Sequence, residues 1–326
     1  MPKELLRVED LHTYFSTYAG LAKAVDGVSF SVDSGEMVGV VGESGCGKSV
    51  MAKSLMRLIP DPPGRIVHGR ISFTGLDIMD LTEKQMQKIR GNDISMIFQE
   101  PMTSLNPTHT VGAQLCEVFT LHQGLTKKEA LEGAVSLLKM VGIPSPAARV
   151  KEYPFQMSGG MRQRVMIAMA LACRPKIILA DEPTTALDVT IQAQVLELIG
   201  QLQKELQTSM ILITHDLGVI AETVKRVLVM YTGKVVEQAS VEELFNNPLH
   251  PYTRGLMESL PSLETEENRH TGVLKEISGV VPDLCRLPPG CSFFPRCPQM
   301  KDICQVEAPK LIKTGKNHFV RCWLYD

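Results

Sequence analysis

The sequence predicts an α/β fold with a mainly parallel sheet, a helical insertion and a small irregular C-terminal appendage. Short apolar runs alternate with helical patterns from residue 5 to about 245, which is typical of such sheets. Helical patterns without strands fill residues 110–173, and prolines replace the periodicity after residue 245. The expected strands are residues 37–41, 94–98, 177–180, 210–214 and 227–231.

The strandless stretch predicts a helical subdomain inserted into the sheet domain. Its expected helices are residues 111–121, 127–141 and 160–173, separated by glycines and prolines. We therefore expect a first domain at residues 1–260, with the helical subdomain at about 105–173. Residues 261–326 would form the appendage.

Composition narrows the class of protein. The 326 residues include 34 Lys and Arg against 36 Asp and Glu, a net charge of -2 that argues against nucleic-acid binding. The charged N-terminus is unlike a signal peptide, and no run approaches the roughly 20 apolar residues of a membrane span. We expect a cytoplasmic protein with reduced thiols that acts on a membrane only through a partner.

A glycine-rich phosphate loop lies between an expected strand and an expected helix. It consists of Gly42, Glu43, Ser44, Gly45, Cys46, Gly47, Lys48 and Ser49, which fit G-x-x-x-x-G-K-[ST]. Backbone N–H groups and the helix N-terminus favour phosphate here, Lys48 would reach the outer phosphates, and Ser49 would bind Mg²⁺. The motif predicts a Mg-ATP site. Cys46 serves as a small spacer, and a partly exposed thiol there would make the ATPase sensitive to alkylation.

Two adjacent carboxylates, Asp181 and Glu182, end the expected strand at 177–180. Successive side chains on a strand point in opposite directions, so both reach one site only where the strand ends. Asp181 then suits the shell of Mg²⁺, and Glu182 suits the attacking water. Such a pair alone is often the start of a loop, but a phosphate loop in the same chain favours the catalytic interpretation.

A serine followed by two glycines begins the expected helix after residue 157, which gives a second helix N-terminus suited to an anion. With this signature loop, the chain resembles the ABC-type ATPases over residues 5–245. The resemblance rests on the order of the phosphate loop, Gln99, the signature loop Ser158, Gly159, Gly160, Met161, Arg162 and Gln163, the carboxylate pair, Ala186-Leu187-Asp188, and His215 after a strand.

The resemblance implies a role for each matching position. Gln99 would link Mg²⁺ and the attacking water to the helical subdomain and the membrane partner. Ser158, Gly159 and Gly160 would contact ATP bound to the opposite subunit of a dimer. Asp188 would lie at the dimer interface, and His215 would contact the terminal phosphate; at a strand end, such a histidine can also be purely structural.

Two features of the resemblance are less regular. Met157 and Met161 replace the first and last residues of the usual Leu-Ser-Gly-Gly-Gln signature, although the serine and glycines are intact. Adenine should stack on an aromatic residue before the first core strand. Tyr18 lies at the most suitable distance, and Tyr14 and Phe15 remain alternatives.

Two further segments, residues 98–107 and 247–254, resemble the ATPase subunits of bacterial dipeptide and oligopeptide importers. This likeness spans nearly the whole chain. It implies two membrane permease subunits, a second related ATPase subunit and an extracytoplasmic peptide-binding protein. The chain would be peripheral, held by the permeases at the cytoplasmic face of the membrane. Nickel importers share much of the pattern, so a nickel-importer ATPase remains an alternative.

Five of the eight cysteines lie between residues 285 and 322, without the C-x-x-C spacing of zinc ribbons. Tails of the dipeptide-importer family imply a [4Fe-4S] cluster, held here by Cys291, Cys297, Cys304 and Cys322, with Cys285 as a possible substitute. Such a cluster would be structural, since few apolar residues are available to hold the tail. The alternative is a set of reduced free thiols.

Three functional classes follow. The first is an energy-coupling subunit in which ATP binding and hydrolysis move attached permeases. The second is an ABC-type ATPase of translation or DNA repair, although those usually carry two cassettes or long coiled coils, and this chain has a single phosphate loop. The third is a redox protein built around the cysteines and regulated by nucleotide.

Overall fold

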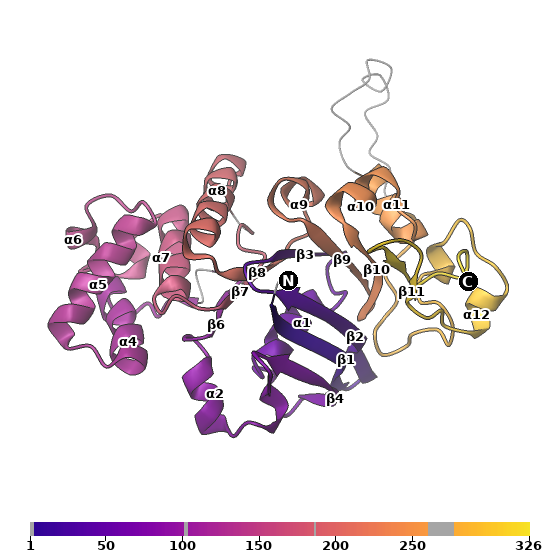
Figure 1. Cartoon of the computed structure of the whole chain (residues 1–326), viewed down its shortest axis with the longest axis horizontal. Coiled ribbons are helices and arrows are strands. Elements are labelled where there is room, and N and C mark those ends of the chain that lie inside the picture. The colour runs from indigo at the N-terminus through magenta and orange to yellow at the C-terminus, as the bar shows by residue number, and fades with distance from the viewer. Residues whose placement is uncertain (1–2, 101–103, 186, 260–276) are drawn as a thin grey trace, which may run out of the picture. The chain divides into compact units, whose positions relative to one another are not determined.

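The computed structural model (Figure 1) describes residues 3–100, 104–185, 187–259 and 277–326. The chain divides into two compact units. Unit 1 comprises Met1–Leu5, Val32–Glu36 and Phe73–Ile213. Unit 2 comprises Leu6–Ser31, Met37–Ser72 and Thr214–Asp326. Each unit contains part of the functional machinery expected from the sequence.

The core of unit 1 is a parallel sheet in the order β8-β7-β6. Its strands are β6 (Ile94–Ile97), β7 (Ile177–Asp181) and β8 (Ser209–Ile213), and all of their residues are buried. Burial on both faces explains why these strands read as continuous apolar runs instead of alternating ones. The three strands predicted in this part of the sequence are confirmed to within one residue at each end.

Most of the other regular elements of unit 1 are helices, and α4 to α7 lie together (Figure 1). The helical interpretation of residues 110–173 is confirmed, since the structure has no strand in this stretch. Local signals set the ends: Thr126 and Glu129 form a capping box, and Gly124 ends α4 in the left-handed conformation. The helices are α2 (Glu83–Ile89), α4 (Val111–Gln123), α5 (Lys127–Met140), α6 (Pro146–Arg149), α7 (Gly159–Leu171) and α8 (Val189–Leu206), with short elements β5 (Leu76–Asp77), η1 (Ile78–Asp80) and η2 (Pro154–Gln156).

Unit 2 contains a five-stranded portion of sheet in the order β11-β12-β10-β9-β3. Strands β3 (Met37–Val41) and β9 (Arg226–Tyr231) are parallel, as predicted for the core. Strands β10 (Lys234–Ser240), β12 (Phe319–Val320) and β11 (Ile312–Lys313) continue it in antiparallel fashion. The sheet therefore changes from parallel to antiparallel between β9 and β10.

A second sheet, absent from the sequence-based expectations, begins the chain. Its long strands β1 (Glu4–Thr17), β2 (Gly20–Asp33) and β4 (Gly64–Phe73) lie in the order β2-β1-β4. Buried and exposed residues alternate only in parts of β1 and β2, so the period-two signal is weak. The helices of unit 2 are α1 (Lys48–Leu55), α9 (Leu217–Thr223), α10 (Val241–Asn246), α11 (Pro251–Glu258) and α12 (Ile303–Val306), with η4 (Phe294–Arg296).

The described part of the tail belongs to the same compact unit as the phosphate loop. Its strand β12 pairs with β10, where Glu237 lies opposite Val320. The fully buried carboxylate of Glu237 accepts hydrogen bonds from His318 Nε2 at 2.7 Å and from the backbone N–H groups of Leu249 and His250 at 2.8 Å each. A buried polar network thus joins the tail to β10.

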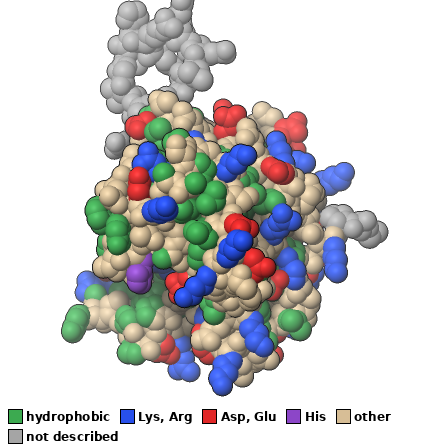
Figure 2. Space-filling model, turned by 90° about the vertical axis from the view of Figure 1, so that its left-hand side faces the viewer, with side chains coloured by type: hydrophobic (Ala, Val, Ile, Leu, Met, Phe, Trp, Pro, Cys, Tyr) green, Lys and Arg blue, Asp and Glu red, His purple; other side chains and the backbone are tan. Residues whose placement is uncertain are grey.

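Charge is mixed on the face of the molecule that Figure 2 presents. Lys and Arg side chains are interspersed there with Asp, Glu and apolar side chains. Within the described ranges, no helix is long and apolar enough to cross a membrane.

Replacing Glu237 should destabilise the protein. Glu237→Ala leaves two buried N–H groups and His318 without their acceptor, so we expect the unfolding free energy to fall by about 3 kcal/mol. Glu243→Ala is the matched control, because that side chain is 60% exposed and lies 3.9 Å from His318; its effect should stay within about 0.5 kcal/mol. Urea denaturation checks both, and equal effects would contradict this role for Glu237.

Candidate functional site

The phosphate loop of unit 2 connects β3 to α1 and needs glycine at two positions. Gly42 has φ 153° and Gly47, the N-cap of α1, has φ 99°. A Cβ atom at Gly42 would lie 2.2 Å from Met230 O, and one at Gly47 would lie 2.0 Å from Ala24 O. The loop backbone therefore packs directly on neighbouring backbone, which only glycine permits.

Lys48 lies at the start of α1 with its side chain folded against the loop. Its Nζ donates to Gly42 O at 2.7 Å and Glu43 O at 3.1 Å, and the residue is 4% exposed. Ser44 and Gly45 are exposed on the loop, and Ser49 is half-buried in the first turn of α1. A buried cation beside a helix N-terminus is suited to bind phosphate.

The thiol of Cys46 is buried, which corrects one expectation. Cys46 is fully buried, and burial raises the pKa of its thiol. A thiol that is both inaccessible and protonated is a poor nucleophile, so the expected sensitivity to alkylation is wrong for this conformation. The interpretation of Cys46 as a small spacer fits its place among the backbone contacts of the loop.

His215 lies in unit 2 and directly follows Thr214, which is bonded to β3. Thr214 N donates to Val40 O at 3.1 Å, and β3 leads into the phosphate loop. The His215 side chain is exposed, and Asp216 caps α9 next to it. His215 is thus placed beside the strand that carries the phosphate loop.

The aromatic candidates for adenine differ in their surroundings. Tyr18 lies in the turn between β1 and β2, and its side chain is fully exposed. Tyr14 donates through its hydroxyl to Asp26 at 2.7 Å, and burial together with this bond raises the pKa of Tyr14. Phe15 lies against Gly64, where an added Cβ would be 2.5 Å from its ring. Tyr18 is thus the most accessible of the three.

In unit 1, Gln99 and Glu182 are brought together. Gln99 Nε2 donates to Glu182 Oε2 at 3.0 Å, and Thr185 Oγ1 donates to the same oxygen at 2.9 Å. Glu182 is 9% exposed and has φ 46°, a left-handed conformation unusual for glutamate. Asp181, 3% exposed, is the last residue of β7. As expected for a shared site, the pair lies at the strand end.

The signature loop begins α7 of unit 1. Ser158 is its N-cap and accepts a hydrogen bond from Met161 N at 3.3 Å, while Ser158 and Gly159 are exposed. Met157 is 3% exposed and fills the apolar position that leucine usually occupies in the signature. Gln163 Nε2 donates to Pro183 O, next to Glu182. The signature helix and the carboxylate loop are thereby joined.

The last two predicted positions in unit 1, Gly160 and Asp188, lie where α7 and α8 begin. An added Cβ at Gly160 would lie 2.8 Å from Ile191, so α7 approaches α8 closely there. Asp188 is exposed and caps α8 by accepting a hydrogen bond from Ile191 N at 3.0 Å. Ala186 of the Ala186-Leu187-Asp188 motif and residues 101–103 of the 98–107 segment lie outside the described residues.

Four tail cysteines line one small cavity of about 10 Å³, together with Phe293, Trp323 and neighbouring residues. They are Cys291, Cys297, Cys304 and Cys322; Cys285 instead contacts Thr17 Oγ1 at 3.4 Å. Burial, with the other three thiols contributing, raises the pKa of Cys291 to about 11. The donor chemistry fits a cluster, but among the described residues no group of three or more Cys, His, Asp or Glu is arranged to hold a metal ion.

Two residues that contact the phosphate loop were not predicted from the sequence. Arg296 forms an ion pair with Glu43 at 2.7 Å, and Tyr252 accepts a hydrogen bond from Glu43 N at 2.8 Å. Both are more than 200 positions from the loop, and no local pattern marks such a pairing. Tyr252 did lie in the segment 247–254 that carried the likeness to importers.

Comparison with known families agrees with this geometry. A model of the family described as ABC transporter matches residues 25–185, which include the phosphate loop, the signature loop and the carboxylate pair. A second model, for the C-terminal region of oligopeptide and dipeptide transporters, matches residues 236–304.

Individual relatives match over almost the full chain. The oligopeptide transport ATP-binding protein AppD of Bacillus subtilis is 52% identical over 322 residues, covering 99% of this chain and 97% of that protein. The dipeptide transport ATP-binding protein DppD of the same organism is 50% identical over 324 residues, covering 99% and 96%. Among solved structures, the ABC transporter cassette MJ0796, described as a dimer, has a TM-score of 0.64 and 28% identity over 72% of this chain and 98% of its own. The chain therefore belongs to the family of ATP-hydrolysing, ATP-binding subunits of di- and oligopeptide ABC transporters.

Proposed function

We propose that this ATPase drives peptide import by closing on ATP together with a second related ATPase subunit. The observation that carries the proposal is the presence in one chain of the phosphate loop and of a C-terminal region typical of peptide transporters, matched at residues 236–304. A nucleotide-regulated redox protein or a translation ATPase does not require that region. Peptide cargo is favoured over nickel because AppD and DppD are oligopeptide and dipeptide transport proteins.

The phosphate loop would bind ATP through its backbone N–H groups, from Gly42 to Ser49. Lys48, which now donates to two loop carbonyls, would exchange them for phosphate oxygens. Ser49, Gln99 and Asp181 would hold Mg²⁺, which neutralises charge on the phosphate oxygens when bound. Tyr18 would stack on adenine.

Glu182 would orient and deprotonate the attacking water. Its carboxylate is fixed by hydrogen bonds from Gln99 and Thr185, so little reorganisation is needed when water arrives. His215 would contact the terminal phosphate. Because Gln99 bonds Glu182 directly, movement of its loop would also alter the orientation of the catalytic carboxylate.

The remaining exposed polar groups fit a dimer interface. Ser158, Gly159 and Gly160 form a helix N-terminus with two exposed residues, which suits phosphate on an opposite subunit. Asp188 is exposed at the next helix start and would lie at the same interface. Two permease subunits would hold the pair at the cytoplasmic face of the membrane, and an extracytoplasmic binding protein would select the peptide.

A [4Fe-4S] cluster on Cys291, Cys297, Cys304 and Cys322 remains part of the proposal. Its support is that the four thiols line one cavity while Cys285 does not. Cysteine-only ligation is the usual chemistry of such clusters, and binding requires the thiols to lose their protons. The cluster would be structural, tying together the parts of the tail that carry the four cysteines.

Glu182→Gln should retain ATP binding and lose turnover. The amide keeps the size of the side chain but is a poor base, so kcat should fall by roughly 10²- to 10⁴-fold. Steady-state hydrolysis and equilibrium ATP binding measure the two effects. Glu197→Gln, an exposed glutamate on α8 that bonds Gln201, is the matched control and should hydrolyse ATP normally. Unchanged turnover in Glu182→Gln would refute the assignment.

Transport coupling predicts permease partners. Affinity purification of the tagged chain from detergent-solubilised membranes, followed by mass spectrometry, should recover two polytopic membrane proteins and a second ATPase of the same family. Membranes carrying the untagged chain are the control. Recovery of ribosomal or DNA-repair proteins in place of permeases would favour the second functional class.

Anaerobically purified protein tests the cluster. We expect about four iron and four sulfide per chain, with visible absorption that bleaches on reduction. Cys304→Ser should lose iron, whereas Cys285→Ser, changed at the cysteine outside the cavity, should retain it. Metal-free protein in which all tail thiols react as free cysteines would establish the alternative.

A further inference from the structure

The phosphate loop contains an acidic side chain, although its ligand is an anion. Glu43 is the second residue of the loop, and its side chain is 29% exposed. A carboxylate free to turn toward ATP would repel the phosphates, and in a partly buried site this repulsion is screened less than in water. Some other group must offset this charge if the loop is to bind ATP tightly.

Arg296 from the tail meets that requirement. Its Nη1 lies 2.7 Å from Glu43 Oε2 and its Nη2 lies 3.0 Å from Glu43 Oε1, so the contact is bidentate. The Arg296 side chain is only 3% exposed. Bidentate arginine–carboxylate pairs fix orientation as well as charge. Hydrogen bonding to Glu43 also raises the pKa of Arg296, which therefore stays charged.

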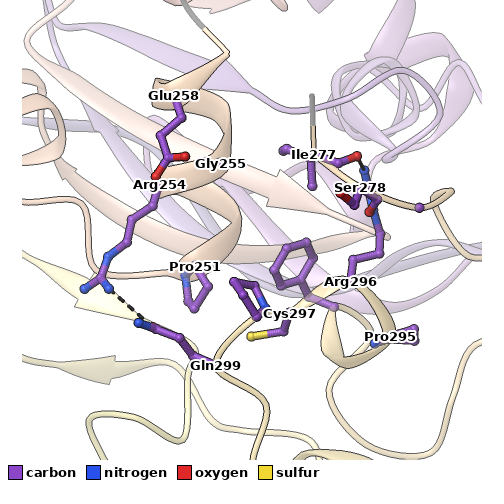
Figure 3. Close-up of a pocket in the computed structure, with 13 residues that line it drawn as sticks. Pro251, Arg254, Gly255, Glu258, Ile277, Ser278, Pro295, Arg296, Cys297 and Gln299 are labelled. Atoms are coloured by element: carbon purple, nitrogen blue, oxygen red, sulfur yellow. Dashed lines mark hydrogen bonds between the residues drawn. The ribbon is translucent and has the colours of Figure 1, made fainter. Parts of the chain in front are cut away.

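The guanidinium of Arg296 is itself held by the tail and by β9. Nε donates to Ser278 O and Nη2 donates to Ile277 O, both at 3.0 Å (Figure 3). The group lies 5.9 Å from the ring centres of both Tyr231 and Phe293. These contacts restrict the Arg296 side chain, so Glu43 pairs with a preorganised partner. Arg296 also lines a cavity of about 640 Å³.

The backbone of Glu43 is held by the same region of the chain. Glu43 N donates to the hydroxyl of Tyr252 at 2.8 Å, and Tyr252 is fully buried. The Tyr252 ring packs against Tyr231 and Phe293, with ring centres 4.6 and 5.5 Å apart. Both ends of Glu43, backbone and carboxylate, are therefore bonded to residues C-terminal to residue 250.

We propose that Arg296 is a positioning residue of the ATP site, which neutralises Glu43 and keeps its carboxylate turned away from the bound phosphates. The tail thereby supplies the positive charge that pairs with the acidic residue of the phosphate loop. This inference rests on ATP binding at that loop. A purely structural role for Arg296 would not depend on the charge of Glu43. In the role proposed here, loss of Arg296 weakens ATP binding because the charge of Glu43 is left unpaired.

Equilibrium binding of a non-hydrolysable ATP analogue to the full-length chain with Mg²⁺ separates the two roles. Arg296→Met should raise Kd about tenfold, the change for a lost charge interaction of about 1.4 kcal/mol. Glu43→Gln should lower Kd, because the guanidinium is then an uncompensated cation near the phosphates. The double variant, which has neither charge, should return close to the parent value.

Arg254→Met is the matched control. Arg254 is also an arginine of this region, and it donates to Gln299 Oε1 (Figure 3). It also donates to the hydroxyl of Tyr325 and to Pro248 O, which are not part of the phosphate loop. It should lower the Tm and leave the Kd unchanged. The proposal is overturned if Arg296→Met changes only the Tm, or if Glu43→Gln weakens binding and fails to rescue Arg296→Met. Failure of the parent chain to bind the analogue would instead refute the ATP site itself.

Discussion

The structure of unit 2 depends on backbone packing directly against backbone at the phosphate loop. Gly42 approaches Met230 O, and Gly47 approaches Ala24 O, each at a distance that excludes any side chain. The loop is therefore shaped by β9 and β2, and its N–H groups are oriented before a ligand arrives. Such preorganisation reduces the entropic cost of binding but requires every neighbour of the loop to be held firmly.

The neighbours are held by polar contacts from distant parts of the chain. Tyr252 and Arg296 bond Glu43, and Glu237 bonds residues of both the 247–254 segment and the tail. Glu237, Tyr252 and the side chain of Arg296 are buried and paired, so removing one partner costs more than the pair itself contributes. A tail with little apolar material can pack in this way because its polar groups find partners in the core.

Features set by nearby residues were predictable from the sequence. The core strands and the helices of residues 110–173 followed from apolar runs, caps and glycines, and the strand-end placement of Asp181 and Glu182 followed from side-chain alternation. The N-terminal sheet was missed because its burial pattern alternates only in parts. The Arg296 pairing was missed because 253 positions separate Arg296 from Glu43, a separation that leaves no local periodicity to read.

The tail packs against the phosphate loop and is therefore part of the nucleotide-binding unit. A tail attached only through a linker could be lost without effect on the phosphate loop, whereas Arg296 of this tail contacts that loop directly. Cys297, which follows Arg296 in sequence, lines the cavity of the four thiols. The residues that would hold a cluster and the residue that pairs with the loop are thus adjacent in the backbone. A rearrangement of the cysteine region would therefore move the backbone that carries Arg296.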